Sequence, residues 1–237
     1  LAAGLGKDDT LWTSPNTFVA SANCALYCGA KPDFVDIYPL TFNMDVDKLE
    51  EKLVGAAKTD SLPKIVIPVH FAGQSCEMER IYDLSKKYNF KIIEDACHAL
   101  GGSYKNIKIG SCGFSDMTVF SFHPVKTLTT GEGGMILTNN EELYEKLLSL
   151  RTHGITRKSK FMEGNSDGPW YYQQIDLGVN YRITDIQASL GISQLKRIDD
   201  FVSKRYELAQ QYNKSLSGLP LILPYLHPDN YSAFHLY

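Results

Sequence analysis

Residues Phe90 to Gly102 read FKIIEDACHALGG and are the stretch that decides the fold class. The mostly apolar run from Phe90 to Ile93 predicts a buried strand, which leads directly into Glu94 and Asp95. A carboxylate therefore lies at the carboxyl end of a strand, where ligands bind in open α/β sheets. Asp95 is either a ligand-binding group at this edge or the N-cap of a following helix.

Strand and helix patterns alternate on both sides of this stretch. Such alternation predicts an α/β protein with a mostly parallel central sheet flanked by helices. Residues 156–174 show little periodicity and are predicted to be a long functional loop. A capping box at Thr184 and Gln187 then opens a helical pattern that reaches about residue 215, with a possible break. The other predicted strands are 9–14, 32–37, 64–69, 117–122 and 134–138, and the other predicted helices are 17–28, 45–57, 76–88 and 140–151.

The stretch Phe120 to Gly134, FSFHPVKTLTTGEGG, places Lys126 in a loop between two apolar strands. Its neighbours are Ser, His, Thr and Gly, which suits a reactive amine, although the loop alone is also compatible with an ordinary surface lysine. An aspartate such as Asp95 can pair with a protonated ring nitrogen, and with a lysine as covalent anchor this is what a pyridoxal phosphate site needs. The run Gly131 to Gly134 lacks a nucleotide-binding spacing and predicts a tight turn.

Composition excludes several classes of protein. A net charge of −3 without a long basic run argues against nucleic acid or an anionic membrane surface as the main partner. No apolar run approaches the roughly 20 residues that cross a bilayer. The five cysteines show no disulfide pattern and no metal-ligand spacing, so we expect no metal site and a reducing, cytoplasmic location. The expected partners are small molecules and a second copy of the chain.

Three motifs resemble one known family. EDACHALGG, FSFHPVKTLTTGEGG and NYRITDIQASLG, the last at Asn180 to Gly191, are similar to the DegT/DnrJ/EryC1/StrS sugar aminotransferases, which are fold-type I pyridoxal phosphate enzymes. The resemblance covers nearly the whole chain. Within the family, FHPVK, GPWYYQQIDLGVNYRITDIQ and the final HLY are most similar to the transaminases of pseudaminic acid biosynthesis.

The resemblance also implies a domain organisation. Members of the family extend further at both ends, so the sequence is expected to be a fragment. Residues 1–200 would form the cofactor-binding large domain without its N-terminal part. Residues 201–237 would form a linker helix and the beginning of a smaller C-terminal domain, which is truncated. An upstream segment that helps to hold the cofactor phosphate would be absent.

The resemblance implies a set of cofactor-binding residues. Lys126 would form the imine with pyridoxal phosphate, and Asp95 would bind the pyridine nitrogen. Three further residues match family positions around the cofactor: His98 at its phenolic oxygen, Ser121 at its phosphate, and Phe18 stacked on its ring. From the residues alone, Phe18 is equally compatible with ordinary core, and a lone histidine such as His98 is more often a core residue.

A second set of residues would complete the site. In the family, the asparagine that matches Asn180 reaches across a dimer interface to the neighbouring cofactor phosphate, and Arg182 shapes the same corner. The alternative is that both only support the helix that follows. His70, at the end of a strand, and His123, in the lysine loop, are candidates to face substrate. Thr129 could line the same site. The aromatics of the long loop, Trp170, Tyr171 and Tyr172, could pack on a sugar ring or lie at a protein interface.

The implied reaction is transamination of a sugar. Lys126 would move the proton in both half-reactions, glutamate would donate the amino group, and C4 of a UDP-linked 4-keto-6-deoxy N-acetyl hexose would accept it. The working enzyme would be a homodimer with shared active sites. Two alternatives stay open: a pyridoxal phosphate-dependent sugar dehydratase, which Lys126 disfavours because the known dehydratases replace this lysine with histidine, and a non-catalytic protein that binds the cofactor or a nucleotide sugar.

Overall fold

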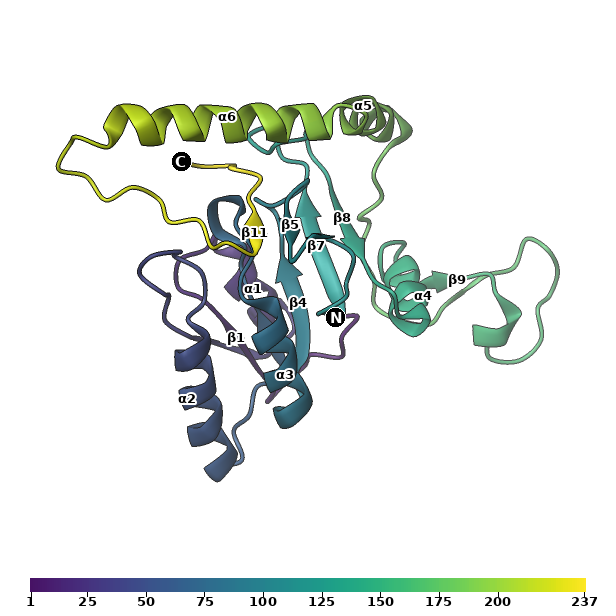
Figure 1. Ribbon diagram of the computed structural model, residues 1–237. Coiled ribbons are helices and arrows are strands. Elements are labelled where there is room, and N and C mark those ends of the chain that lie inside the picture. The colour runs from purple at the N-terminus through teal and green to yellow at the C-terminus, as the bar shows by residue number, and fades with distance from the viewer.

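The computed structural model describes residues 1–237 and is built around a six-stranded sheet (Figure 1). The five strands β2, β1, β3, β4 and β7 are parallel, and β8 pairs antiparallel with β7 at one edge. The prediction of a mostly parallel α/β sheet is therefore confirmed. In sheet order the strands are β2 (Lys31–Phe34), β1 (Thr10–Thr13), β3 (Ile65–Ile67), β4 (Lys91–Asp95), β7 (Met117–Ser121) and β8 (Gly134–Leu137).

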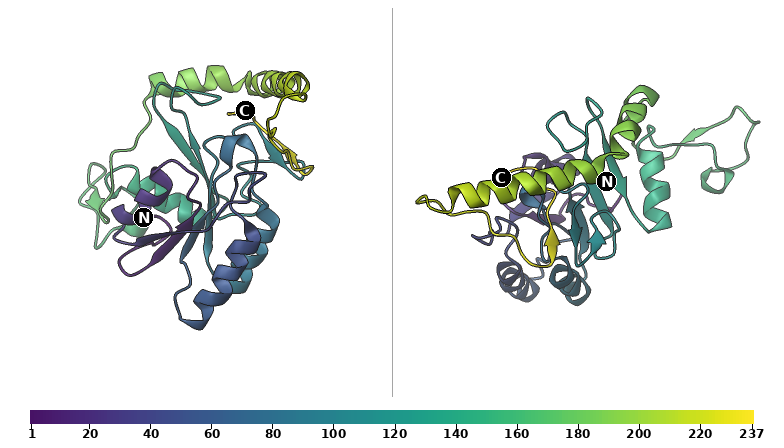
Figure 2. Two further views of the ribbon diagram at one scale, coloured as in Figure 1. Left: turned by 90° about the vertical axis from the view of Figure 1, so that its left-hand side faces the viewer. Right: turned by 45° about the horizontal axis from the view of Figure 1, so that its top comes forward.

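Helices cover both faces of the sheet (Figure 2). One face carries α2 (Val46–Lys58) and α3 (Met78–Tyr88), and the other carries α1 (Ala20–Tyr27) and α4 (Glu141–Leu150). Because side chains alternate along a strand, each strand contributes to both cores. Trp12, Val66 and Ile92 pack with α2 and α3, whereas Leu11, Ile65 and Ile67 pack in the α1 core.

The helix boundaries follow local capping chemistry. Asp45 accepts hydrogen bonds from the backbone N–H groups of Asp47 and Lys48 at the start of α2. The expected capping box is also present, since the side chains of Thr184 and Gln187 satisfy each other's backbone groups. The long helical pattern breaks after Leu195, which separates α5 (Asp185–Leu195) from α6 (Ile198–Leu216). Helix α6 runs across the end of the molecule toward which β4 and β7 point (Figure 1).

The expected long loop is partly ordered into a hairpin arm. It contains β9 (Ile155–Thr156), the short 3₁₀ helix η2 (Ser159–Phe161) and β10 (Gln173–Gln174), and it projects from the body beside α4 (Figure 1). The prediction of a structureless segment is corrected in this respect. Strands of two residues are too short to show a period-two pattern in sequence.

Three short strands that the sequence pattern missed form a second small sheet. They are β5 (Ser103–Tyr104), β6 (Ile107–Lys108) and β11 (Asn230–Tyr231), in the order β11-β5-β6. The chain therefore returns from α6 to the body of the molecule near its C-terminal end. The division at residue 200 into a large domain and the start of a small one stays a prediction. All five cysteines are free, and none of the helices has the length and apolar character needed to span a membrane.

Candidate active site

The carboxyl end of β4 directs two adjacent carboxylates to opposite faces of the sheet. Glu94 pairs in register with Thr118 and lies on the α2 and α3 face, whereas Asp95 lies on the face covered by α1. The alternation follows from the pleat of the strand. Because β1, β3, β4 and β7 are parallel, their carboxyl ends share this edge, which is the usual ligand-binding edge of such a sheet.

On the Glu94 side of the strand, hydrogen bonds from other side chains occupy the carboxylate. His70 Nε2 lies 2.7 Å from Glu94 Oε2, and the hydroxyls of Ser115 and Thr118 donate to Oε1. The backbone N–H of Cys76 donates to His70 Nδ1 at 3.2 Å, so the ring proton lies on Nε2 and is donated to Glu94. Burial alone would raise the pKa of Glu94, but the hydrogen bonds from His70 and the two hydroxyls hold it below its ordinary value.

His70 therefore does not occupy the position expected from the sequence. Its side chain is 0 % exposed and both ring nitrogens have protein partners, so the ring has no face for a substrate. The expectation that His70 faces substrate is corrected. A strand that ends in IPVH is compatible with either an exposed or a buried histidine, and the deciding partner, Glu94, is distant in sequence.

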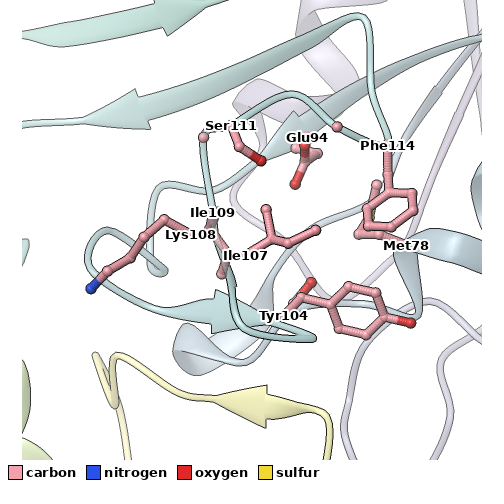
Figure 3. Close-up of a pocket in the computed structure, with 11 residues that line it drawn as sticks. Met78, Glu94, Tyr104, Ile107, Lys108, Ile109, Ser111 and Phe114 are labelled. Atoms are coloured by element: carbon pink, nitrogen blue, oxygen red, sulfur yellow. The ribbon is translucent and has the colours of Figure 1, made fainter.

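The small cavity beside Glu94 is separate from the candidate site. Figure 3 shows it between Glu94, Met78 and Phe114, with Tyr104 and Ile107 at its side. Its volume of about 20 Å³ has room for a single water. No cofactor-sized group fits there, which leaves the Asp95 side of β4 as the candidate ligand-binding side.

Asp95 is held in place from α1. The Ser21 hydroxyl donates to Asp95 Oδ2 at 2.6 Å and lies 2.9 Å from the Thr17 hydroxyl. The backbone N–H of Cys97 donates to Oδ1 at 3.2 Å. Phe18 follows Thr17 and is 75 % exposed, so the alternative that it is ordinary core is wrong. An exposed aromatic thus lies one residue from the chain of hydroxyls that positions the carboxylate.

The loop that carries Lys126 joins β7 to β8. Phe122 N–H donates to Gly133 O at 2.8 Å and closes the base of the loop. The Lys126 side chain is half-buried, and the one ion pair of the loop joins His123 to Glu132 instead. Gly131 has a φ of 81°, as expected for a glycine in a tight turn. The amine is thus presented from a closed loop without a carboxylate partner.

Helix α5 holds this loop through one face. Gln194 Nε2 donates to Thr129 O at 2.6 Å, and Gln187 Nε2 donates to Glu132 O at 3.0 Å. Between them, a Cβ at Gly191 would lie 2.9 Å from Thr130 Cγ2, so the loop packs against the bare backbone of the helix. Sequence reasoning missed these supporting roles, although the spacing 187, 191 and 194 does place the three residues on one helical face.

Lys126, Asp95 and His98 come together at this edge. Burial is the main cause that lowers the pKa of His98 to about 4, the positive charge of Lys126 lowers it further, and Asp95 opposes both. The adjacent Cys97 thiol also lies between these charges, and its pKa is raised first by burial and then by Asp95. The two motifs, which are about thirty residues apart in sequence, therefore form one site.

The residues at this edge fit the predicted cofactor. His98 Nδ1 is buried and has no hydrogen-bond partner in the protein, whereas Nε2 is not closed off in this way. An imidazole with one accessible nitrogen, an unpaired amine, a positioned carboxylate and an exposed aromatic ring are what pyridoxal phosphate requires. Ser121 ends β7, two residues beyond the partner of Asp95, and its hydroxyl accepts from the His123 N–H.

The remaining candidates lie at the margin or outside this cluster. His123 is exposed beside Glu132, and the Thr129 hydroxyl donates to Phe122 O, so Thr129 closes the loop. Asn180 pairs through its backbone with Thr152 beyond α4, and the side chains of Asn180 and Arg182 are both exposed. Within one chain, no hydrogen bond joins either of them to the lysine loop. The aromatic residues Trp170 and Tyr172 are exposed on the hairpin arm.

One histidine at this site was missed in the sequence. His235, in the final HLY, lies with its ring centroid 4.4 Å from that of His98. Burial is the main cause that lowers the pKa of His235 to about 4, and the positive charges of His98, Lys126 and Arg205 lower it further. The HLY motif carries a family resemblance, but nothing in its local pattern indicates which strand edge it approaches.

Comparisons with known proteins agree with this geometry. The model of the DegT/DnrJ/EryC1/StrS aminotransferase family matches residues 1–237. The chain is 42 % identical over 237 residues to the spore coat polysaccharide biosynthesis protein SpsC of Bacillus subtilis, covering 100 % of this chain and 59 % of SpsC. It is 44 % identical over 208 residues to the UDP-4-amino-4,6-dideoxy-N-acetyl-beta-L-altrosamine transaminase of Campylobacter jejuni strain 81-176, covering 88 % of this chain and 51 % of that enzyme. It is 35 % identical to the GDP-perosamine synthase of Escherichia coli O157:H7, covering 100 % of this chain and 59 % of that enzyme. The chain thus spans about half to three fifths of these relatives.

Solved structures share the fold. Helicobacter pylori PseC, an aminotransferase of pseudaminic acid biosynthesis, superposes with a TM-score of 0.84 at 36 % identity, covering 98 % of this chain and 58 % of PseC. The PMP-form of the sugar aminotransferase homologue Spr1654 from Streptococcus pneumoniae has a TM-score of 0.84 at 31 % identity, covering 99 % of this chain and 62 % of Spr1654. A PLP-form of Spr1654 is also known. The predicted fold type and the pyridoxal phosphate cofactor of the family are confirmed. The chain belongs to the DegT/DnrJ/EryC1/StrS aminotransferase family.

Proposed function

We propose that the full-length protein is a pyridoxal phosphate-dependent aminotransferase that acts on a nucleotide-linked sugar. The observation that carries this proposal is the meeting of Lys126, Asp95 and His98 at one edge of the sheet, where the charges of the lysine and the aspartate both act on the histidine. Residues 1–200 would form most of the cofactor-binding domain, and residues 201–237 would open the smaller one. The five free cysteines suit a reducing compartment, and we place the enzyme in the cytoplasm.

Each residue of the site has a distinct task in the proposed mechanism. Pyridoxal phosphate, when bound, supplies a carbonyl carbon for an amine to bond and a ring that accepts electrons. Lys126 Nζ would hold the cofactor through that carbon and, once an amino donor takes its place there, would be free to act as the general base that moves the proton. Asp95, fixed by Ser21, would keep the ring nitrogen protonated. His98 would donate from Nε2 to the phenolic oxygen.

Two further residues, Ser121 and Phe18, would hold the cofactor in position. The Ser121 hydroxyl can donate to the phosphate without adding charge. Phe18 is exposed beside α1, which leaves its ring free to stack on a pyridine. Holding the reacting atoms in one geometry is itself a large part of such catalysis.

We propose glutamate as the amino donor and C4 of a UDP-linked 4-keto-6-deoxy N-acetyl hexose as the acceptor, in pseudaminic acid or related surface-glycan biosynthesis. The identity to the altrosamine transaminase, 44 %, exceeds that to the GDP-perosamine synthase, 35 %. Purified full-length protein should therefore turn over the UDP-linked sugar with a kcat/KM well above that for the GDP-linked one. The opposite preference would refute the substrate but leave the reaction type intact.

We further propose a homodimer in which Asn180 and Arg182 complete the partner's site. Helix α5, which begins just after them, buries none of its residues, and Ile186 is 83 % exposed. Apolar residues that α5 leaves exposed outside the face that holds the lysine loop, such as Leu190 and Ile192, suit an interface between copies. His123 would then lie at the rim, where substrate enters.

Mixed dimers test this arrangement. Lys126→Ala and Asn180→Ala should each be nearly inactive alone. After the two are unfolded and refolded together, half of the dimers are mixed and each mixed dimer holds one intact site, so about a quarter of wild-type activity should return. If no activity returns, Asn180 serves the site of its own chain.

The reaction type is tested by visible absorbance of the full-length protein with pyridoxal phosphate, before and after glutamate. A band of lysine-bound cofactor that glutamate converts to the pyridoxamine form would support the proposal. A band that glutamate leaves unchanged would favour a dehydratase or another donor. If no band forms although the cofactor binds, the protein is a binding module.

A further inference from the structure

The last residues of the chain are tied to the body at several points. Strand β11 pairs with β5, Ala233 N–H donates to Gly73 O at 3.0 Å, and Leu236 N–H donates to Ala72 O at 3.2 Å. From the other side, Arg205 of α6 donates to Phe234 O at 3.1 Å. His235 is therefore held between two fixed segments, and its ring position is set by the fold.

The backbone is strained where these segments meet. Ala72 has a φ of 58° and Phe234 a φ of 43°, which is the left-handed region that non-glycine residues rarely adopt. Gly73 has a φ of 110°, and a Cβ there would lie 2.8 Å from Phe234 N. Strain of this kind persists where the surrounding structure imposes it, and it concentrates at functional sites. The close approach brings His235 next to His98.

The two imidazoles pack against each other at a tilt. Their centroids are 4.4 Å apart with an interplanar angle of 32°, and the edge of Phe71 packs on His98 at 6.0 Å. Nδ1 of each ring is buried and has no hydrogen-bond partner, whereas Nε2 of each ring is not among the buried, unpartnered atoms. Two polar rings with one open nitrogen each are thus held beside Lys126.

This geometry selects one tautomer of His98. A buried N–H without an acceptor is rarer in proteins than a buried acceptor without a donor. The proton is therefore excluded from the enclosed Nδ1 and lies on Nε2. A ring that could rotate would lose this preference, because Nδ1 would then find water or another partner.

We propose that His235 is a positioning residue of the active site: its ring stacks on His98 and fixes the orientation in which His98 offers Nε2–H to the cofactor's phenolic oxygen. This inference rests on the proposed function for the role of His98. The stacking itself is a property of the cofactor-free protein, so it can be tested separately. No step of the reaction passes through His235.

Two substitutions in the full-length protein separate stacking from other roles. His235→Ala removes the ring, and His235→Phe keeps a flat ring but removes both nitrogens. His227→Asn, on the same C-terminal segment but away from Lys126, is the control. The first readout is the ¹⁵N and ¹³C NMR spectrum of labelled histidine in the cofactor-free protein, which reports the tautomer and pKa of His98. The second is the dissociation constant of pyridoxal phosphate.

The proposal predicts that wild type and His235→Phe show His98 as the Nε2–H tautomer at pH 7. In His235→Ala the tautomers should mix, the pKa of His98 should rise, and the cofactor should bind between about twofold and tenfold more weakly, the range that an aromatic pair contributes. His98→Ala combined with His235→Ala should bind no more weakly than His98→Ala alone.

Two results would overturn the proposal. One is an unchanged His98 spectrum in His235→Ala. The other is a loss in His235→Phe as large as that in His235→Ala, since the nitrogens rather than the stacked ring would then matter. Because these spectra need no cofactor, they stand even if the enzyme proves not to be a transaminase. Failure of glutamate to convert the bound cofactor would refute the proposed function alone.

Discussion

Two neighbouring carboxylates, Glu94 and Asp95, differ in how completely the polar groups around them find hydrogen-bond partners within the protein. Around Glu94 every polar group has a protein partner, including both nitrogens of His70. Around Asp95 the protein leaves Nδ1 of His98 and of His235 unpaired and the amine of Lys126 without a carboxylate. A saturated buried network stabilises a fold, whereas an unsaturated one beside an open edge is the signature of a ligand site. We therefore expect Glu94 to have a structural role and Asp95 to act in the chemistry.

The largest effect is expected for the amine on the unsaturated side. Lys126→Ala should lower turnover on the order of 10⁵-fold, because covalent anchor and proton carrier are lost together. The free energy of unfolding should change little, since the lysine makes no ion pair. Steady-state kinetics and denaturant unfolding of the full-length protein measure the two effects. Turnover that persists would refute the assignment of Lys126.

The paired variants Asp95→Asn and Glu94→Gln test the comparison itself. Asp95→Asn should reduce kcat by about 10³-fold and leave stability within about 1 kcal/mol, because the amide can still accept a hydrogen bond but carries no charge. Glu94→Gln should lower the free energy of unfolding by about 3 kcal/mol, because its N–H₂ would face the Nε2–H of His70. If Glu94→Gln lost kcat and Asp95→Asn lost stability instead, Glu94 would be the residue that acts in the chemistry and Asp95 the structural one.

The two histidines on the Asp95 side should make the stability of the protein depend on pH. His98 and His235 have pKa values near 4 in the folded chain and about 6.5 when unfolded, so between these values the unfolded state binds more protons. The cofactor-free protein should therefore lose stability as the pH falls from about 6.5 to about 4, with an uptake of up to two protons on unfolding. Urea unfolding at several pH values checks this. Replacement of both histidines by Asn should flatten the slope, and an unchanged slope would place the titration elsewhere.

The smallest effect is expected at the face of α5 that supports the lysine loop. Gly191→Ala should reduce turnover about three- to tenfold, because the new Cβ would displace Thr130 and with it the loop. Stability should change little, since alanine in a helix gains about 1 kcal/mol that offsets the crowding. Gly55→Ala in α2 is the matched control: its Cβ would meet nothing within 4 Å, so it should gain stability and keep full activity.

The sequence predicted the parts of this site that depend on local pattern. The strand that leads into Asp95, the capping box at Thr184 and the turn at Gly131 each have a signal within a few residues, and the structure has all three. His70 was misplaced and His235 was missed because their surroundings are set by residues that lie far away in the chain. The two-residue strands of the hairpin arm and of the second sheet were missed because they are too short to show a period.

The central claim, that the Asp95 side binds pyridoxal phosphate through Lys126, has one direct test. The full-length protein is incubated with pyridoxal phosphate, reduced with borohydride so that the bond between lysine and cofactor becomes permanent, and digested for mass spectrometry. We predict that the reduced cofactor is found on the peptide containing Lys126 and disappears in Lys126→Arg. Modification of a different lysine, or a wild-type protein that retains no cofactor after reduction, would contradict the claim.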